Sequence, residues 1–362
     1  MKSPFVWFGG KRRVADVVWY ALGDVDNYVE PFAGSLAVLL ARPHKLADAS
    51  RRAETINDKD QYVANFWRAL SADPEQVAFF CDWPVNETDL FARHLWLVNT
   101  GRALLAANLE ADPDWYDAKI AGWWVWGVNA WIGSGWCAGT GPWVHADDDE
   151  EGNRKRPHLG DAGQGVNRQV PHLGDAGKGV NRQVPHLGDA GKAGFNNLEH
   201  KLRPGGIEAY LTELAGRLRD VRVCCGDWAR VVTRGALSYG ARVGVFVDPP
   251  YLGAVRTADL YATDDHHIAN GVREWCLANG DDPRLRIVLA GYSDEHDHLI
   301  PKSWRRHRWS TSAAYSTTAS AARQDGNHAN RGNEVLWISP HCVPERAPDL
   351  FSSQADAEGT TG

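Results

Sequence analysis

The chain has 362 residues, an apolar content of 43% and a formal net charge of −7. This length allows one large domain or two with a substantial core. The six cysteines include no C-x-x-C pair, so the sequence predicts neither a zinc site nor a disulfide framework and favours a cytoplasmic location. No uninterrupted apolar run approaches the roughly 18 residues of a membrane span, so we expect no membrane partner.

Residues 1 to about 70 are predicted to form strand–loop–helix units. A candidate strand at 25–29 leads into the loop Glu-Pro-Phe-Ala-Gly-Ser at 30–35, and the apolar stretch at 36–41 follows. A second candidate strand ends at Asp58, with apolar residues at helical spacing behind it, at positions 62, 66, 67 and 70. This alternation is typical of an α/β domain.

The middle zone, about 71 to 204, differs from both flanks. It begins with helical, aromatic-rich sequence and later enters a repeat with a period of 14 residues at 158–194. Glycine and proline are too frequent there for a helix, so we expect surface turns or short strands. Residues 154–203 hold nine Lys and Arg against four Asp and Glu, in a chain that is acidic as a whole. This balance favours contact with nucleic-acid phosphates, and a passively expanded loop is the alternative.

The third zone, about 205 to 345, returns to α/β sequence. An apolar helical stripe runs through 207–218. The basic cluster from Lys302 to Arg308 is interpreted as a solvated face, and the polar tail at 346–362 is predicted to be disordered. Candidate strands lie at 221–225, 243–247, 286–290 and 334–338.

The tetrapeptide Asp248-Pro249-Pro250-Tyr251 follows an apolar run typical of a buried parallel strand. Ligand sites in open α/β sheets lie beyond the carboxyl ends of strands. There, Asp248 and the carbonyl of Pro249 can each accept a hydrogen bond from an amino group, and neither proline has an N–H to compete. Tyr251 offers a flat face for stacking. The tetrapeptide therefore suits the exocyclic amine of an extruded base, and a proline-rich turn is the plainer alternative.

Four motifs occur in a fixed order along the chain. They are Phe5–Lys11, Glu30–Ser35, Gly226–Trp228 and Asp248–Tyr251. In this order they resemble the Dam-like family of adenine-specific DNA methyltransferases, which use S-adenosylmethionine. The resemblance implies an α/β, Rossmann-like class I methyltransferase sheet, formed by residues 1–70 and 205–345. Residues 71–204 would then be an inserted, largely helical or irregular target-recognition region.

The resemblance also implies which residues hold the cofactor. Trp7 and Lys11 would contact its methionine end, through the indole face and by pairing with the carboxylate. Asp58 would bind the ribose hydroxyls, although a helix N-cap is an alternative role for it. The full implied set is Trp7, Gly9, Gly10, Lys11, Glu30, Phe32, Gly34, Asp58, Asp227 and Trp228.

The implied reaction is methylation of the N(6) amine of an adenine flipped out of double-stranded DNA, with Asp248, Pro249, Pro250 and Tyr251 as catalytic residues. No metal is expected, and the protein is predicted to be a monomer or a dimer. Two alternatives stay open, namely methylation of the exocyclic amine of cytosine and a non-catalytic cofactor-binding module that binds DNA. Candidate DNA contacts are Arg168, Lys178, Arg182, Lys192 and Arg331.

Overall fold

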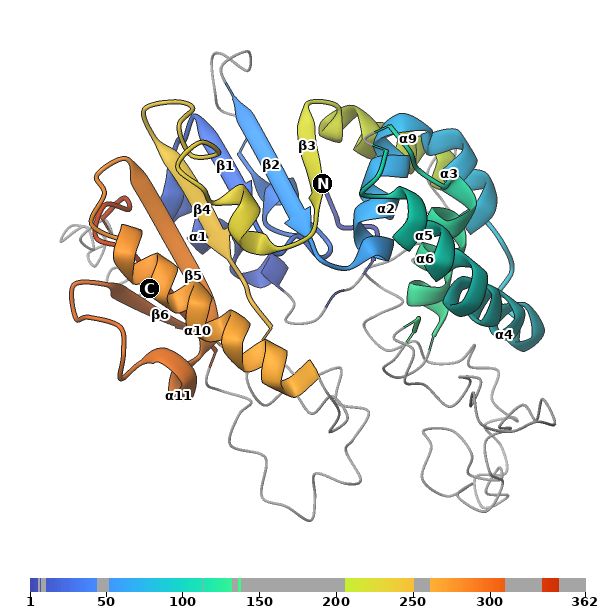
Figure 1. Cartoon of the computed structure of the whole chain (residues 1–362). Coiled ribbons are helices and arrows are strands. Elements are labelled where there is room, and N and C mark those ends of the chain that lie inside the picture. Colours follow the sequence, from blue (N-terminus) through green and yellow to red (C-terminus); the bar gives the residue numbers. More distant parts are fainter. Residues whose placement is uncertain are drawn as a thin grey trace, which may run out of the picture.

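A seven-stranded sheet in the order β3-β2-β1-β4-β5-β7-β6 is the centre of the protein (Figure 1). The computed structural model describes residues 1–5, 7, 11–43, 52–112, 114–131, 136–137, 206–250, 261–309 and 334–344. The strands are β1 (Asn27–Glu30), β2 (Ala53–Asp58), β3 (Val221–Cys225), β4 (Val243–Val247), β5 (Leu285–Tyr292), β6 (Arg305–Trp309) and β7 (Glu334–Ile338).

The direction of the strands confirms the expected Rossmann-like sheet. β3, β2, β1, β4 and β5 pair in parallel, and β7 lies antiparallel between β5 and β6. The chain reverses its strand order between β1 and β4, which are neighbours in the sheet. Such a switch point is where open α/β sheets bind ligands, beyond the carboxyl ends of the strands.

Helices cover both faces of the sheet and extend past its β3 edge (Figure 1). A group formed by α2 to α6 and α9 lies beside β3, while α10 lies over β5. The α-helices are α1 (Ala15–Leu22), α2 (Gln61–Ala72), α3 (Pro74–Cys81), α4 (Glu87–Trp96), α5 (Arg102–Asn108), α6 (Ala118–Ala130), α9 (Gly206–Leu218), α10 (Tyr261–Asn279) and α11 (Ser293–His296). Three short 3-10 helices are η1 (Lys11–Arg13), η2 (Leu39–Ala41) and η7 (Trp228–Val231), and a π-helical segment, η4 (Leu97–Gly101), joins α4 to α5.

The central strands are apolar throughout because both faces of the sheet are buried. All five residues of β4 are buried. Phe246 packs with α1 residues on one face, whereas Val245 and Val247 pack with Val272 of α10 on the other. The alternation of β-strand side chains thus divides the core into two layers.

Between residues 71 and 131, within the region that the sequence predicts to be an insert, the described residues are largely helical. Three of these helices, α3, α4 and α6, begin at polar caps: Asp73, Asn86 and Asp117 each accept a hydrogen bond from a backbone N–H in the first turn. An aromatic cluster joins these helices to the start of the chain, because the ring of Phe5 lies 5.1 Å from that of Trp124 and 5.5 Å from that of Phe66. The extreme N-terminal segment is therefore held against α2 and α6.

Two features of the fold differ from expectation. The basic cluster at 302–308 is largely β6, an edge strand that the sequence did not predict, and its basic side chains are exposed or half-buried, as expected for a solvated face. Two of its arginines, Arg306 and Arg308, pair with Asp297 at 3.0 Å and 2.9 Å, which neutralises part of its charge. The apolar stretch at 36–41 forms only the short 3-10 turn η2 within residues 31–43, since Leu36 adopts a positive φ of 56° that interrupts a helix.

Some predictions concern residues outside the described part. The repeats at 158–194 and the tail at 346–362 both lie there. Among the helices that the structure describes, none has the length and apolar character needed to cross a membrane.

Candidate active site

The predicted site residues converge at the carboxyl edge of the sheet, at the switch point between β1 and β4. Val29 pairs with Val245, so the loop that follows Glu30 and the segment that follows Val247 leave the sheet side by side. Asp248, Pro249 and Pro250 lie directly beyond β4, whereas Tyr251 lies outside the described residues. The strand and the position predicted for Asp248 are therefore as expected.

The loop after β1 is shaped by Gly34. This residue has a φ of +46°, and a Cβ built on it would lie 2.4 Å from Cδ1 of Trp7. Only glycine allows both this backbone conformation and this close approach. The carbonyl of Gly34 also accepts a 2.9 Å hydrogen bond from the buried indole of Trp67 on α2. Trp7 and the loop, distant in sequence, thus form one surface.

Asp58, at the end of β2, holds the same loop from the other side. Its Oδ2 accepts a 2.9 Å hydrogen bond from the backbone N–H of Gly34, and its Oδ1 accepts one from Asp60. The N-cap of α2 is Asp60, whose side chain accepts from Tyr62, so the capping alternative for Asp58 is wrong. Burial, and then the nearby charge of Asp60, raise the pKa of Asp58 to about 7.

Asn57 is a residue of this site that sequence reasoning missed. Its buried amide donates 3.0 Å hydrogen bonds to the carbonyls of Pro31 and Gly226, which lie in the loops after β1 and β3. One side chain therefore fixes the spacing of two loops that were both predicted to hold the cofactor. Its place beside Asp58 at a strand end was the available signal.

Two aromatic rings face each other across these loops. The rings of Phe32 and Trp228 are stacked, with centroids 6.3 Å apart and an angle of 29° between their planes. Trp275 of α10 supports Trp228 edge-on at 6.4 Å. Asp227 is exposed and accepts a 2.8 Å hydrogen bond from the backbone N–H of Ala229. It thereby caps η7, which begins with Trp228.

Lys11 lies beside Asp248. Its Nζ is 3.0 Å from Oδ1 of Asp248 and 3.8 Å from Oε2 of Glu334, and it lies 5.6 Å from the ring centroid of Trp309. Lys11 and Glu334 are both buried. Glu334 reaches this edge because β7 runs antiparallel to β5 and pairs its first residue with Tyr292, the last residue of β5. Sequence reasoning gave Glu334 no role.

Glu30 lies beneath the loop and not on its surface. Its side chain is 3% exposed and accepts a 2.9 Å hydrogen bond from the hydroxyl of Tyr28. Burial is the main cause that raises the pKa of Glu30 to about 8, with a smaller contribution from the charge of Asp248. Glu30 is therefore largely protonated at neutral pH and supports the loop from below.

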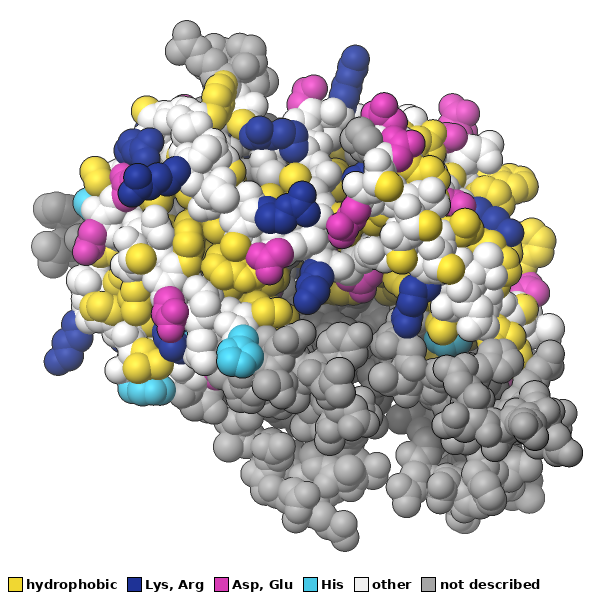
Figure 2. Space-filling view, viewed as in Figure 1, with side chains coloured by type: hydrophobic (Ala, Val, Ile, Leu, Met, Phe, Trp, Pro, Cys, Tyr) yellow, Lys and Arg dark blue, Asp and Glu magenta, His cyan; other side chains and the backbone are white. Residues whose placement is uncertain are grey.

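Several predicted residues lie outside the described part of the chain. These are the cofactor glycines Gly9 and Gly10 and the candidate DNA contacts Arg168, Lys178, Arg182, Lys192 and Arg331. On the face shown in Figure 2, basic, acidic and apolar side chains of the described residues are interspersed and form no continuous basic band.

The comparison with protein families decides the class of the protein. Residues 7–87 match the model of the D12 class N6 adenine-specific DNA methyltransferases. The chain is an adenine-specific DNA methyltransferase. The matched segment includes Trp7, the loop after β1 and Asp58, and it confirms the Dam-like resemblance drawn from the motifs. A comparison with curated proteins gave no match.

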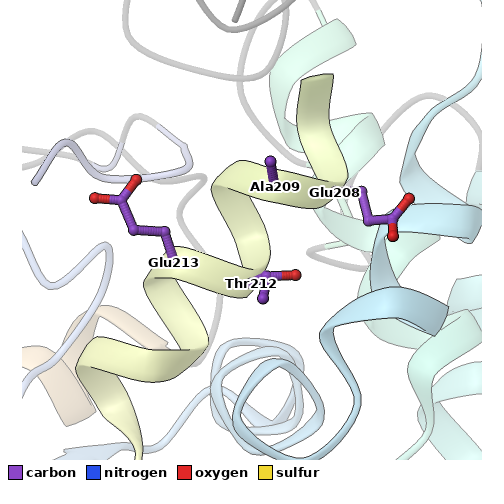
Figure 3. Close-up of a pocket in the computed structure, with 4 residues that line it drawn as sticks. All are labelled: Glu208, Ala209, Thr212 and Glu213. Carbon is purple, nitrogen blue, oxygen red and sulfur yellow. The ribbon is translucent and has the colours of Figure 1, made fainter. Parts of the chain in front are cut away.

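Two other features of the methyltransferase do not add to this site. No group of His, Cys, Asp and Glu among the described residues could hold a metal ion. A pocket on α9 is lined by Glu208, Ala209, Thr212 and Glu213, none of which belongs to a predicted motif (Figure 3). Its two carboxylates point away from each other and do not form a binding pair.

Proposed function

We propose that this methyltransferase takes its methyl group from S-adenosylmethionine and transfers it to the N(6) amine of an adenine flipped out of double-stranded DNA. The observation that carries the proposal is the position of Asp248 and Pro249 at the switch point of the sheet, beside the loop that Gly34 and Asp58 shape. Both acceptors of an amino group thus lie next to a surface suited to a nucleoside.

The residues after β1, β2 and β3 fit the proposed cofactor. Gly34 leaves no room for a Cβ and presents bare backbone, as a closely approaching ligand requires. Asp58 offers a carboxylate to ribose hydroxyls, and Phe32 and Trp228 offer aromatic faces to the adenine. Trp7 is placed against Gly34, where its indole can approach a sulfonium. When bound, the cofactor supplies an electrophilic methyl group.

Two of the implied cofactor residues have narrower proposed roles. Glu30 is too buried to contact the cofactor directly, so we assign it the support of the loop. Asp227 is proposed to act through the N-cap that orients Trp228. Gly9 and Gly10 keep the roles that the motif implies.

On the base side, Asp248 and Pro249 would act on the lone pair of the target amine. That lone pair is delocalised into the adenine ring, which makes the amine a poor nucleophile. Hydrogen bonds from the amine to the carboxylate of Asp248 and to the carbonyl of Pro249 localise it on nitrogen. Asp248 is also placed to accept the proton that the amine releases. Rate enhancement then comes mainly from positioning and matched electrostatics.

The proposed cations of the repeats, Arg168, Lys178, Arg182 and Lys192, would contact DNA phosphates and add affinity without sequence information. Deleting one copy, residues 172–185, should leave cofactor affinity unchanged and weaken DNA binding. The slope of log affinity against log salt concentration should become shallower by about 0.9 for each lost phosphate contact. Salt plots that coincide for the intact and shortened proteins would support a passive loop.

The proposed function is tested by incubating the purified protein with labelled S-adenosylmethionine and double-stranded DNA, followed by digestion to nucleosides. We expect the label in N(6)-methyladenosine of the DNA. Label in N(4)-methylcytosine would support the cytosine alternative. Cofactor binding without transfer to any DNA would support a non-catalytic module.

A further inference from the structure

Lys11 joins two acidic side chains that come from opposite directions of the sheet. Asp248 follows the parallel strand β4, and Glu334 begins the antiparallel strand β7. The ammonium of Lys11 lies between them, 3.0 Å from one carboxylate and 3.8 Å from the other. The ring of Trp309 from β6 lies 5.6 Å from the same ammonium. The elements η1, β6 and β7 and the segment after β4 thus meet around one cation.

A buried charge cluster of this kind is costly unless its members compensate one another. The charged or titratable groups around Asp248 include Lys11 from η1, Glu30 from β1 and Glu334 from β7. Lys11 is the cation among these three groups. Its ammonium lies 3.0 Å from Oδ1 of Asp248 and so constrains the orientation of that carboxylate. Without Lys11 the carboxylate would lose this constraint.

We propose that Lys11 and Glu334 are positioning residues for Asp248. Glu334 fixes the ammonium of Lys11, and Lys11 holds Oδ1 of Asp248 in place. The second oxygen, Oδ2, is then the acceptor for the target amine. This inference rests on the proposed function, since it assigns Lys11 to the base side and not to the carboxylate of the cofactor.

The two roles of Lys11 predict different kinetics. A positioning role affects the rate of methyl transfer at saturating cofactor, whereas a cofactor contact affects mainly cofactor affinity. We expect Lys11→Met to reduce the single-turnover rate by about 10²-fold at neutral pH, because the carboxylate is misplaced. Cofactor affinity, measured by titration calorimetry, should stay within about threefold.

A conservative variant separates positioning from general damage. Lys11→Arg keeps a cation beside Asp248 and should recover at least part of the rate that Lys11→Met loses. Thermal unfolding of both variants, measured alongside, distinguishes a loss of rate from a loss of fold.

Glu334→Gln tests the second residue of the pair. The rate should fall by about three- to tenfold, and the same change should cost nothing further in the Lys11→Met background, because the two act as a unit. Glu54→Gln is the matched control: Glu54 is buried and paired with Arg42 and Arg217. It should lower thermal stability and leave the rate within about twofold.

Three results would overturn the inference. The first is a Lys11→Met variant with full rate at saturating cofactor and lost cofactor affinity. The second is a Lys11→Arg variant that folds but recovers none of the rate, and the third is additive losses in the double variant. Where Glu334→Gln does not fold, the two Lys11 variants decide through their rates and cofactor affinities. Failure of the proposed function is distinguishable, because the unmodified protein would then transfer no methyl group to adenine.

Discussion

The backbone N–H of Gly34 donates a 2.9 Å hydrogen bond to Oδ2 of Asp58, which joins the loop after β1 to the end of β2. The same glycine lies against Trp7 and accepts a hydrogen bond from Trp67. The proposed cofactor surface is therefore assembled from four segments of the chain that converge on one residue without a side chain.

Gly34→Ala should disturb this assembly. The new Cβ would lie 2.4 Å from Cδ1 of Trp7 in a backbone conformation with a φ of +46°. We expect a loss of about 1–3 kcal/mol in the free energy of unfolding, together with weaker cofactor binding. Urea denaturation and cofactor titration measure the two effects. Gly216→Ala is the matched control, since nothing lies within 4 Å of its Cβ in α9, and it should be neutral or stabilising. Equal behaviour of the two variants would contradict the account.

Cofactor affinity should depend on the protonation of Asp58. Burial raises the pKa of this carboxyl to about 7, so it loses its charge as the pH falls through neutrality. An ionised acceptor binds hydroxyls more strongly than a neutral one. The dissociation constant should therefore rise by about three- to tenfold between pH 8 and pH 6, and Asp58→Asn should show a flat profile. Parallel pH profiles for the two proteins would rule out this role.

The facing rings of Phe32 and Trp228 should both contribute to cofactor affinity. Each change, Phe32→Ala or Trp228→Ala, removes one aromatic face and should cost about 1–3 kcal/mol of binding free energy. Phe79→Ala serves as the control, because Phe79 is 71% exposed on α3. Titration calorimetry with all three variants checks this. If affinity survives in both site variants, the adenine does not bind between these loops.

Glu30 should make stability fall as the pH rises. Its pKa is raised from 4.5 in the unfolded chain to about 8 in the fold, mainly by burial. Between these values the folded protein holds a proton that the unfolded chain has released, so stability declines by up to about 1.4 kcal/mol per pH unit. Glu30→Gln mimics the protonated carboxyl and removes this penalty. Denaturation at pH 5, 7 and 9 should show the advantage of the variant growing with pH, whereas a constant difference would be evidence against a raised pKa.

The sequence predicted most of the sheet because most of its strands are apolar runs, and β4 and β7 are buried throughout. The predictions at 221–225, 243–247 and 334–338 coincide with β3, β4 and β7. β6 was not predicted because Arg305 to Trp309 is an edge strand, and two of its arginines pair with Asp297, which is distant from them in the local pattern. Charge along a chain does not reveal such partners.

The site was predictable where a motif dictates local geometry. Gly34 and Asp248 lie where their motifs indicated, at the carboxyl ends of β1 and β4. Asn57 and Glu334 were missed for a physical reason. Their roles depend on which loops and strands become neighbours, and in particular on the antiparallel direction of β7, which no local pattern encodes.

The central claim is that Asp248 acts on the target amine and not on the cofactor. Asp248→Ala tests it most directly, in one preparation assayed for methyl transfer to DNA adenine and for cofactor binding by titration calorimetry. We expect transfer to be abolished while cofactor affinity stays within about tenfold, since the carboxylate lies beyond β4, pairs with Lys11 and is assigned to the target amine. Near-normal transfer in this variant would contradict the account.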